Sequence, residues 1–439
     1  MSNRTPAEFR KKLGRTNELP LLFAVMIFQL AAMLLIAFRD NAADAFSLRM
    51  CLLLPGGTYL GLAILKRLWP VDRAVYILTA FLCSLSVILL RAVFSLPDRA
   101  ADQAEYLVVG YAAMLFGAFF IRRVKNWKRF ARLLMPLCLI ALVLPFFFAN
   151  STAKNWVRVG SLQCQPSELM KPVITVILAA GFSAKRSIRG WHGYALFGAI
   201  SCGILLFQRD LGAVFLYFAL TLGMFYAGTG NKRVTLTVLI LAAAGASLAM
   251  YKIDWIAEKF PSLQYAATRI QLWKNPWASD YKYSYQIIQG LISIVSGGVF
   301  GSGLGLGSAI RVSVVASDYI FAALSEELGI AFAICVLVVY LCLLLRSVTA
   351  AMNARQRFHA LVAFGCSFEI TVQMLLIVCG NLHLIPLTGV TLPFVSEGGS
   401  SLVACMAQTG MILGVTSINA QDEYDDLCRL NGAKWRDGE

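Results

Sequence analysis

Charged residues and histidines are scarce in this chain, and their scarcity excludes several classes of protein. Only 14% of the 439 residues are charged, whereas 58% are hydrophobic. This balance excludes a soluble globular domain and is typical of a polytopic membrane protein. The chain has 3 histidines, and its 11 cysteines lie mostly inside apolar runs without paired CxxC spacing. The pattern indicates neither a metal cluster nor a disulfide framework.

The excess of basic residues follows a membrane pattern. The formal net charge is +15, but the basic side chains form short clusters between apolar runs and do not form the single stripe expected of a nucleic-acid-binding protein. If the N-terminus is cytoplasmic, every such cluster falls on the inner side, as the positive-inside rule requires. The clusters are Lys66, Arg67 and Arg73; Arg122, Arg123, Lys125, Lys128, Arg129 and Arg132; Lys185, Arg186 and Arg189; Lys232 and Arg233; and Arg346, Arg355 and Arg357.

Apolar runs of about 20 residues, the length that crosses a bilayer as a helix, recur along the whole chain. We expect twelve spans, near 19–38, 46–65, 74–94, 104–121, 131–149, 166–182, 191–207, 211–228, 234–251, 318–345, 360–380 and 400–418. The sequence therefore predicts an all-α polytopic membrane protein of about 12 transmembrane helices, with both termini in the cytoplasm. Nine spans precede the long polar segment that starts at residue 252, so this loop is predicted to be extracytoplasmic.

The predicted outer loop, residues 252–315, interrupts the apolar pattern. Its first part mixes acidic and basic residues with tryptophans and tyrosines, a combination suited to holding a sugar-bearing, negatively charged molecule. Its second part is too rich in glycine for a lipid-facing helix, so we expect a re-entrant or amphipathic stretch buried against the bundle. We divide the chain into N-terminal spans (1–150), a core with this loop (151–419) and a cytoplasmic tail (420–439).

Four stretches combine irregular backbone with polar residues at membrane depth, where unpaired polar groups are costly. Around the first, Pro166 begins a helix, and a helix start is a sufficient structural explanation. In the second, a local pair between Arg209 and Asp210 is expected to hold a tight turn. The stretches are 154–168; 208–212; 285–289 with 296–305, 317–322 and 326–329; and 380–401.

In this order, the four stretches closely resemble the SEDS family (shape, elongation, division and sporulation), which comprises the FtsW, RodA and SpoVE proteins. The similarity covers roughly Lys154 to Ser417. Its most specific part is 386–401, which is similar to the signature P-x-TG-x-x-LPF-x-S-x-GGSS; Glu397 stands where the family commonly has Tyr. Family members commonly have ten spans, so the resemblance implies two extra spans within the first 150 residues, where the match is weak.

The resemblance implies a peptidoglycan glycosyltransferase of the bacterial cytoplasmic membrane. Such enzymes polymerise lipid II, the undecaprenyl-diphosphate-linked disaccharide-peptide, onto a nascent glycan strand during division, elongation or sporulation. It also implies a class B penicillin-binding protein as partner.

The resemblance implies an essential carboxylate ahead of the Tyr285-Gln286-x-x-Gln289 element, and Asp280 is the matching position. The other acids of the loop's first part are Asp254 and Glu258. A single carboxylate suits the chemistry, because a diphosphate leaves as an anion and needs no acid to protonate it. Asp280 would then act as the general base for an inverting transfer, unlike the paired carboxyls of glycoside hydrolysis.

Charge that develops on the diphosphate must be offset by preorganised cations, for which Arg158, Arg269, Lys274 and Arg311 are the outer candidates. Contact with solvent or a lipid headgroup is an equal alternative for each. Mg²⁺ partnered by Asp280 is a further alternative, but no metal-binding spacing supports it and no cofactor is assigned. The expected substrate-binding residues are Lys154, Trp156, Arg158, Glu168, Arg269, Lys274, Trp277, Gln286, Gln289, Ser400 and Ser401.

Two other functions stay open on the sequence. A transporter of the lipid-linked precursor also fits many spans and buried acids, but it should show two related halves with discontinuous helices, and we find no internal repeat. A non-catalytic scaffold would not need Asp280. The intramembrane acids Glu326, Glu327 and Glu369 are expected to pair inside the bundle, although such groups are often functional.

Overall fold

The computed structural model describes residues 18–39, 44–94, 97–148, 155–159, 162–183, 191–259, 264–277, 281–312 and 314–436. The N-terminal half contains α2 (Leu19–Ala37), α3 (Ala45–Leu68), α4 (Arg73–Val93), α5 (Asp98–Arg123), α6 (Trp127–Val143), α7 (Pro145–Phe148), β1 (Val157–Val159), β2 (Leu162–Cys164), α8 (Pro166–Phe182), α9 (His192–Phe207) and α10 (Leu211–Thr229). The remainder contains α11 (Lys232–Tyr251), α12 (Ile253–Lys259), α13 (Gln264–Lys274), α14 (Tyr281–Ser296), the 3-10 helix η2 (Ala309–Arg311), α15 (Ile320–Met352), α16 (Arg357–Asn381) and α17 (Gly399–Arg436).

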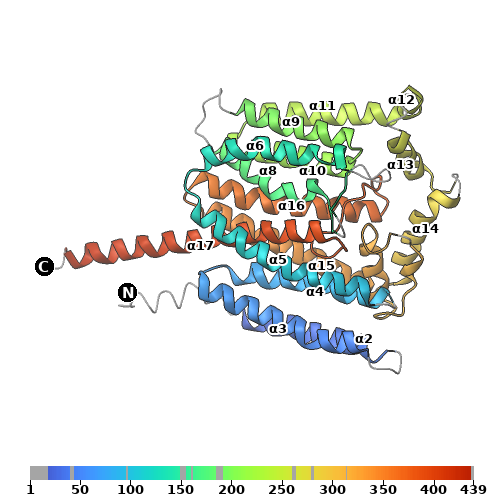
Figure 1. Cartoon of the computed structure of the whole chain (residues 1–439), viewed down its shortest axis with the longest axis horizontal. Coiled ribbons are helices and arrows are strands. Elements are labelled where there is room, and N and C mark those ends of the chain that lie inside the picture. The colour runs from blue at the N-terminus through green and yellow to red at the C-terminus, as the bar shows by residue number, and fades with distance from the viewer. Residues whose placement is uncertain are drawn as a thin grey trace.

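The long helices run side by side as one bundle (Figure 1). In the described part of the chain, 10 helices are long and apolar enough to cross a membrane. The two other expected spans are present as α8 and α9, of 17 and 16 residues. The predicted all-α polytopic membrane fold is thereby confirmed. Helices α12, α13 and α14, which belong to the predicted outer loop, lie across one end of the bundle (Figure 1).

Short polar side chains fix where several of these helices begin. Asp44 accepts hydrogen bonds from the backbone N–H groups of Phe46 and Ser47 at the start of α3, and Asp72 does the same for Ala74 at the start of α4. Such N-caps satisfy donors that have no partner within the helix. In the turns before α3 and α4, an aspartate therefore marks the residue at which the helix begins.

The centre of the bundle is formed by α4, α16 and α17, whose most apolar windows are 83%, 72% and 78% buried. Helix α11 lies at the periphery, with none of its apolar window buried. Helices α5 and α17 approach closely at Gly410, where a Cβ would lie 2.0 Å from the carbonyl oxygen of Met114. Glycine is required there because any side chain would push the two backbones apart.

The glycine-rich part of the outer loop packs into a break in α15. At Gly329 the backbone leaves the helical conformation, with φ of 83°. On either side of this break, Ser302 donates to the carbonyl of Glu326 (2.8 Å) and Ile330 donates to that of Gly298 (3.0 Å). The side chain of Glu326 accepts from the backbone N–H of Ser308 at 2.7 Å. The predicted buried stretch is therefore an amphipathic helix, α14, followed by a segment inserted against the bundle, and Glu326 has partners there as expected.

The helix that contains the C-terminal span is longer than the predicted span. We expected a span near 400–418 followed by a short solvated tail; α17 continues without a break to Arg436, and its later part projects from the bundle at the end opposite α12–α14 (Figure 1). The acidic residues after Gln421 are compatible with a helix, and no proline interrupts them. Contacts also support the continuation: Asn419 donates to the carbonyl of Ala350 at 2.7 Å, and Asp426 pairs with Arg355 at 2.8 Å.

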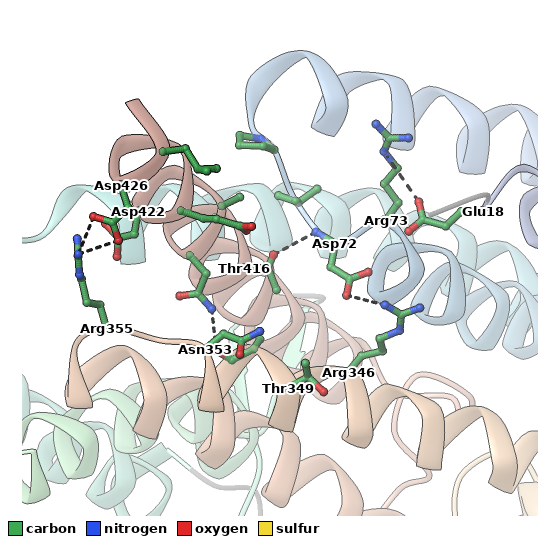
Figure 2. A pocket seen from close by; sticks show the side chains of 17 residues that line it. Glu18, Asp72, Arg73, Arg346, Thr349, Asn353, Arg355, Thr416, Asp422 and Asp426 are labelled. Atoms are coloured by element: carbon green, nitrogen blue, oxygen red, sulfur yellow. Dashed lines mark hydrogen bonds and ion pairs between the residues drawn. The ribbon is translucent and has the colours of Figure 1, made fainter. Parts of the chain in front are cut away.

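A polar cavity of about 750 Å³ lies where α17 leaves the bundle. Its charged side chains pair between elements that are distant in sequence: Arg346 lies 3.5 Å from Asp72, and Arg355 pairs with Asp426 (Figure 2). The backbone N–H of Asp72 also donates to Thr416 at 3.2 Å. These contacts fasten the connections α3–α4 and α15–α16 to α17.

Candidate functional site

A second polar cavity, of about 670 Å³, lies at the end of the bundle that carries α13. This volume is within the range of about 300–1,000 Å³ typical of ligand pockets. Segments far apart in the sequence meet there, and all four motif stretches contribute. The lining residues are Asp102, Gln103, Tyr106, Asn155, Trp156, Gln163, Gln165, Glu168, Gln208, Arg209, Asp210, Arg269, Ser317, Asp318, Thr388, Gly389, Thr391, Glu397, Gly398, Gly399, Ser400 and Ser401.

One side of the cavity is built by the turn between α9 and α10. Asp210 caps α10 by accepting from the backbone N–H of Ala213. Its other oxygen accepts from the amides of Asn155 (3.0 Å) and Gln165 (2.8 Å), which flank the hairpin of β1 and β2. Among the described residues, no ion pair joins Arg209 to Asp210, so the predicted local pair is wrong. The amides of the hairpin satisfy the carboxylate instead, and Arg209 adopts a positive φ of 63°.

A buried charged pair on α8 connects the cavity to the interior of the bundle. Lys171, fully buried on α8, donates to both oxygens of Glu168 at 2.7 Å. It also donates to Gln373 of α16 at 2.8 Å. Glu168 lines the cavity, so the pair connects the cavity wall to the interior. A buried charge is tolerated only when it is paired and hydrogen-bonded, and here every proton of the ammonium group has an acceptor.

The same chain of hydrogen bonds reaches the signature segment between α16 and α17. The amide of Gln373 donates to the carbonyl of Thr391 at 2.8 Å, and the hydroxyls of Thr391 and Ser401 lie 2.7 Å apart. Ser396 donates to the carbonyl of Ser317 at 2.6 Å, which ties the segment to the start of α15. The signature residues therefore form one rigid wall of the cavity.

Helix α13 of the outer loop closes the opposite side. Arg269 lines the cavity and donates to the carbonyl of Leu387 at 2.9 Å, and the indole of Trp273 donates to that of His383 at 3.1 Å. Arg269 also faces Asp318. Desolvation raises the pKa of Asp318, although the hydroxyl of Ser317 and the charge of Arg269 partly oppose the shift.

Other charges at the cavity are also compensated. Glu397, which replaces the common tyrosine of the signature, pairs with Arg99 at 2.6 Å. Arg209 and Arg269 are the basic residues that the structure places in the lining of this cavity, beside the carboxylates of Asp102, Glu168, Asp210, Asp318 and Glu397. The many polar side chains suit a ligand with hydroxyl groups, and Arg209 and Arg269 are the lining residues that could contact a negatively charged part of it.

The cavity brings together five of the predicted substrate-binding residues: Trp156, Glu168, Arg269, Ser400 and Ser401. The other described ones do not line it. Arg158 is exposed on β1, Lys274 is exposed and donates to the carbonyl of Met250, Trp277 is 74% exposed, and Gln286 and Gln289 are half-buried on α14. Arg311 is also exposed. Lys154 and the predicted base, Asp280, lie outside the described residues, so their roles stay predictions.

Sequence reasoning missed Lys171, Gln373 and Asp318 as parts of the site. The signal for Lys171 was available, because a lone lysine three residues after Glu168 in an apolar span requires a partner. Gln373 gives a weaker signal, since a glutamine in an apolar run is commonly satisfied within the bundle.

Metal binding is not decided by the described residues. Among them, no three His, Cys, Asp or Glu side chains converge in a way that would hold a metal ion. Asp280, the residue proposed to share a Mg²⁺ ion, is not among them, so this alternative stays untested.

Comparisons with known proteins agree with the motifs. The sequence model of the FtsW/RodA/SpoVE family, described as cell cycle protein, matches residues 72–421. The chain is 31% identical to the peptidoglycan glycosyltransferase RodA of Mycobacterium tuberculosis H37Rv over 326 residues, which are 70% of this chain and 67% of the relative. It is also 31% identical to the stage V sporulation protein E of Bacillus subtilis, over 72% of this chain and 86% of the relative.

Solved structures show the same fold. A chain from a study of how a peptidoglycan synthase complex coordinates polymerization and crosslinking superposes with a TM-score of 0.65 at 23% identity, covering 80% of this chain and 98% of that chain. The rod shape determining protein RodA of Thermus thermophilus gives a TM-score of 0.56 at 23% identity, covering 79% and 96%.

Proposed function

This chain belongs to the FtsW/RodA/SpoVE family of cell cycle proteins, and from that membership we propose that it is a peptidoglycan glycosyltransferase that polymerises lipid II. The observation that carries the proposal is the meeting of the signature segment and the outer loop at one cavity. Arg269 of α13 and Ser401 of α17 line the same space, so α13 of the outer loop lies beside the signature residues.

The proposed reaction joins two lipid-linked saccharides. A hydroxyl of the acceptor sugar attacks the anomeric carbon of the donor, and the bond from that carbon to the diphosphate oxygen breaks with inversion. The diphosphate leaves with the electron pair, and Asp280 takes the proton of the attacking hydroxyl as general base. In the sequence, Asp280 directly precedes Tyr281, the first residue of α14.

The charge on the departing diphosphate needs a cation. Arg269 is the best-placed candidate, because it lines the cavity and is held by the carbonyl of Leu387. A preorganised guanidinium stabilises the transition state without having to reorganise during the reaction. Arg209 lines the same cavity from the α9–α10 turn and offers a second contact.

The proposed setting is the bacterial cytoplasmic membrane, with the cavity on the extracytoplasmic face. The clusters of Lys and Arg between spans support this orientation. We further propose a class B penicillin-binding protein as partner, on the ground that a fold neighbour comes from a peptidoglycan synthase complex.

The direct test is polymerisation of lipid II by the purified protein, with and without a penicillin-binding protein. We expect glycan strands from the wild type and a loss of about 10²–10⁴-fold in rate for Asp280→Asn, as for removal of a general base. Glu258→Gln is the matched control, because it removes another carboxyl of the same loop, and it should stay active. Normal polymerisation by Asp280→Asn would remove the assigned base.

A precursor transporter or a scaffold would give different results. A transporter would move lipid II between leaflets of a vesicle without forming polymer, and a scaffold would stimulate its partner equally well with Asp280→Asn. The enzyme is favoured because residues of the motif stretches line a single cavity at one end of the bundle, whereas a transporter should place its binding residues in two related halves.

A further inference from the structure

Helices α2 and α3 precede residues 72–421, the part of the chain that matches the family. They form a hairpin that packs beside α4 (Figure 1). Within it, Gln29 donates to Thr58 at 3.0 Å, and Phe28 stacks on Phe332 of α15 with ring centroids 5.5 Å apart. The hairpin is therefore docked against the bundle, and the C-terminal end of α2 lies at the same end of the bundle as α14 (Figure 1).

Arg39, at the end of α2, joins this hairpin to the outer loop. Its Nη1 atom donates to the carbonyl of Gly305 at 3.1 Å and to that of Ala92 at 3.2 Å. Gly305 has a φ of +79°, and a Cβ there would lie 2.0 Å from the same Nη1 atom. Glycine at 305 is thus needed for its backbone conformation and for the approach of the guanidinium.

The other arm of the hairpin is anchored independently. Asp44, which caps α3, pairs with Arg91 of α4 at 2.8 Å, and Arg91 also donates to the carbonyl of Phe94 at 2.9 Å. Burial opposes ionisation of Asp44, but hydrogen bonds from Ser47 and Arg91 outweigh it and lower its pKa. Loss of Arg39 should therefore leave the hairpin docked.

The segment that Arg39 holds continues directly from α14. Gly305 donates its N–H to Glu327, and Gly301 packs against Gly329, where a Cβ at 301 would lie 2.6 Å from the backbone nitrogen. Further back along α14, Gly290 lies against the ring of Tyr319, 2.5 Å from a Cβ at that position. A displacement at 305 would thus be passed to α14, and α14 begins one residue after Asp280.

We propose that the α2–α3 hairpin is a brace for the catalytic loop and that Arg39 is a positioning residue for the reaction. This inference rests on the proposed function for its kinetic part only. Arg39 acts through Gly305 and does not contact substrate. Its removal should loosen residues 297–312 and misplace α14, while the cavity that binds substrate keeps its lining residues.

The test compares Arg39→Ala with Arg49→Ala, which removes an exposed arginine from the same hairpin. Hydrogen–deuterium exchange should become faster in 297–312 and α14 for Arg39→Ala and stay at the wild-type rate for Arg49→Ala. In lipid II polymerisation, kcat should fall about ten- to a hundredfold, as for a misplacement of about 1 Å, with KM within about twofold. Arg39→Lys keeps one donor and should recover part of kcat.

A second variant keeps the inference testable if Arg39→Ala does not fold. Gly305→Ala disturbs the same contact from the loop side in a chain that keeps Arg39. It should speed exchange in 297–312 more than the control Gly303→Ala, which also places alanine at a positive φ (+102° at Gly303) but meets Leu306 and not Arg39. Exchange in 297–312 that is unchanged in Arg39→Ala, or no faster in Gly305→Ala than in Gly303→Ala, would overturn the brace. If the wild type makes no polymer, the proposed function fails, whereas the exchange experiment still decides whether the brace exists.

Discussion

Lys171 carries a charge at a position that water does not reach, and its partners determine whether the fold tolerates it. Replacing it by methionine would leave Glu168 as a buried carboxylate without its cation. We expect Lys171→Met to lower the free energy of unfolding by roughly 3–5 kcal/mol, as for other broken buried pairs. Unfolding of the purified protein in detergent, followed by intrinsic fluorescence, measures this.

The control is the double variant Glu168→Gln/Lys171→Met, which removes both charges. It should recover more than half of the stability lost in Lys171→Met, because no uncompensated charge remains in the pair. A double variant as unstable as the single one would show that the pair does not account for the loss.

We expect the stability of the fold to depend on pH because folding raises the pKa of Asp318. Its pKa in the folded protein is raised above the ordinary value of 3.8, so between these two values the folded state binds more protons than the unfolded state. Stability must then increase as pH falls through this window. In thermal unfolding, the wild type should gain stability relative to Asp318→Asn on going from pH 7.5 towards pH 4.5.

Asp102→Asn is the matched control, since it removes an exposed carboxyl from the same cavity. Between pH 7.5 and pH 4.5, Asp102→Asn should show the same change in thermal stability as the wild type. If Asp318→Asn and the wild type respond identically to pH, then ionisation of Asp318 is not linked to folding.

The residues of the site could be predicted where a motif carries them and not where they depend on tertiary contacts. Ser400 and Ser401 were found from the signature, and they line the cavity. The partners of Asp210 were not found, because Asn155 and Gln165 come from a hairpin 55 and 45 residues earlier in the chain. The predicted local pair with Arg209 was wrong because the side-chain amides of Asn155 and Gln165 donate to the carboxylate of Asp210 instead.

At the scale of helices, the apolar runs were sufficient to locate the spans. The expected span 166–182 coincides with α8, and 211–228 differs from α10 by one residue. The end of α17 was missed because the loss of hydrophobicity after residue 418 marks the end of the apolar window and does not mark the end of the helix. The amphipathic α14 was expected only in outline, since its packing depends on the distant break at Gly329.

For the whole molecule, the distribution of charge predicts which end faces the outside. A membrane-impermeant maleimide should label an engineered cysteine at Trp277, which is 74% exposed, in right-side-out vesicles. Cys428, exposed on the projecting part of α17, should be labelled only in inside-out vesicles. Labelled peptides are identified by mass spectrometry, and detergent-solubilised protein should react at both positions. The reverse pattern would invert the topology and remove the proposed access to extracytoplasmic substrate.

The uninterrupted course of α17 has a mechanical consequence. Its first turn supplies Ser400 and Ser401 to the cavity wall, and it runs 38 residues from Gly399 to Arg436, a length of about 57 Å at 1.5 Å per residue. Without a hinge, such a rod transmits rotation from end to end. A protein that binds the projecting end of α17 would therefore be mechanically coupled to Ser400 and Ser401 in the wall of the cavity.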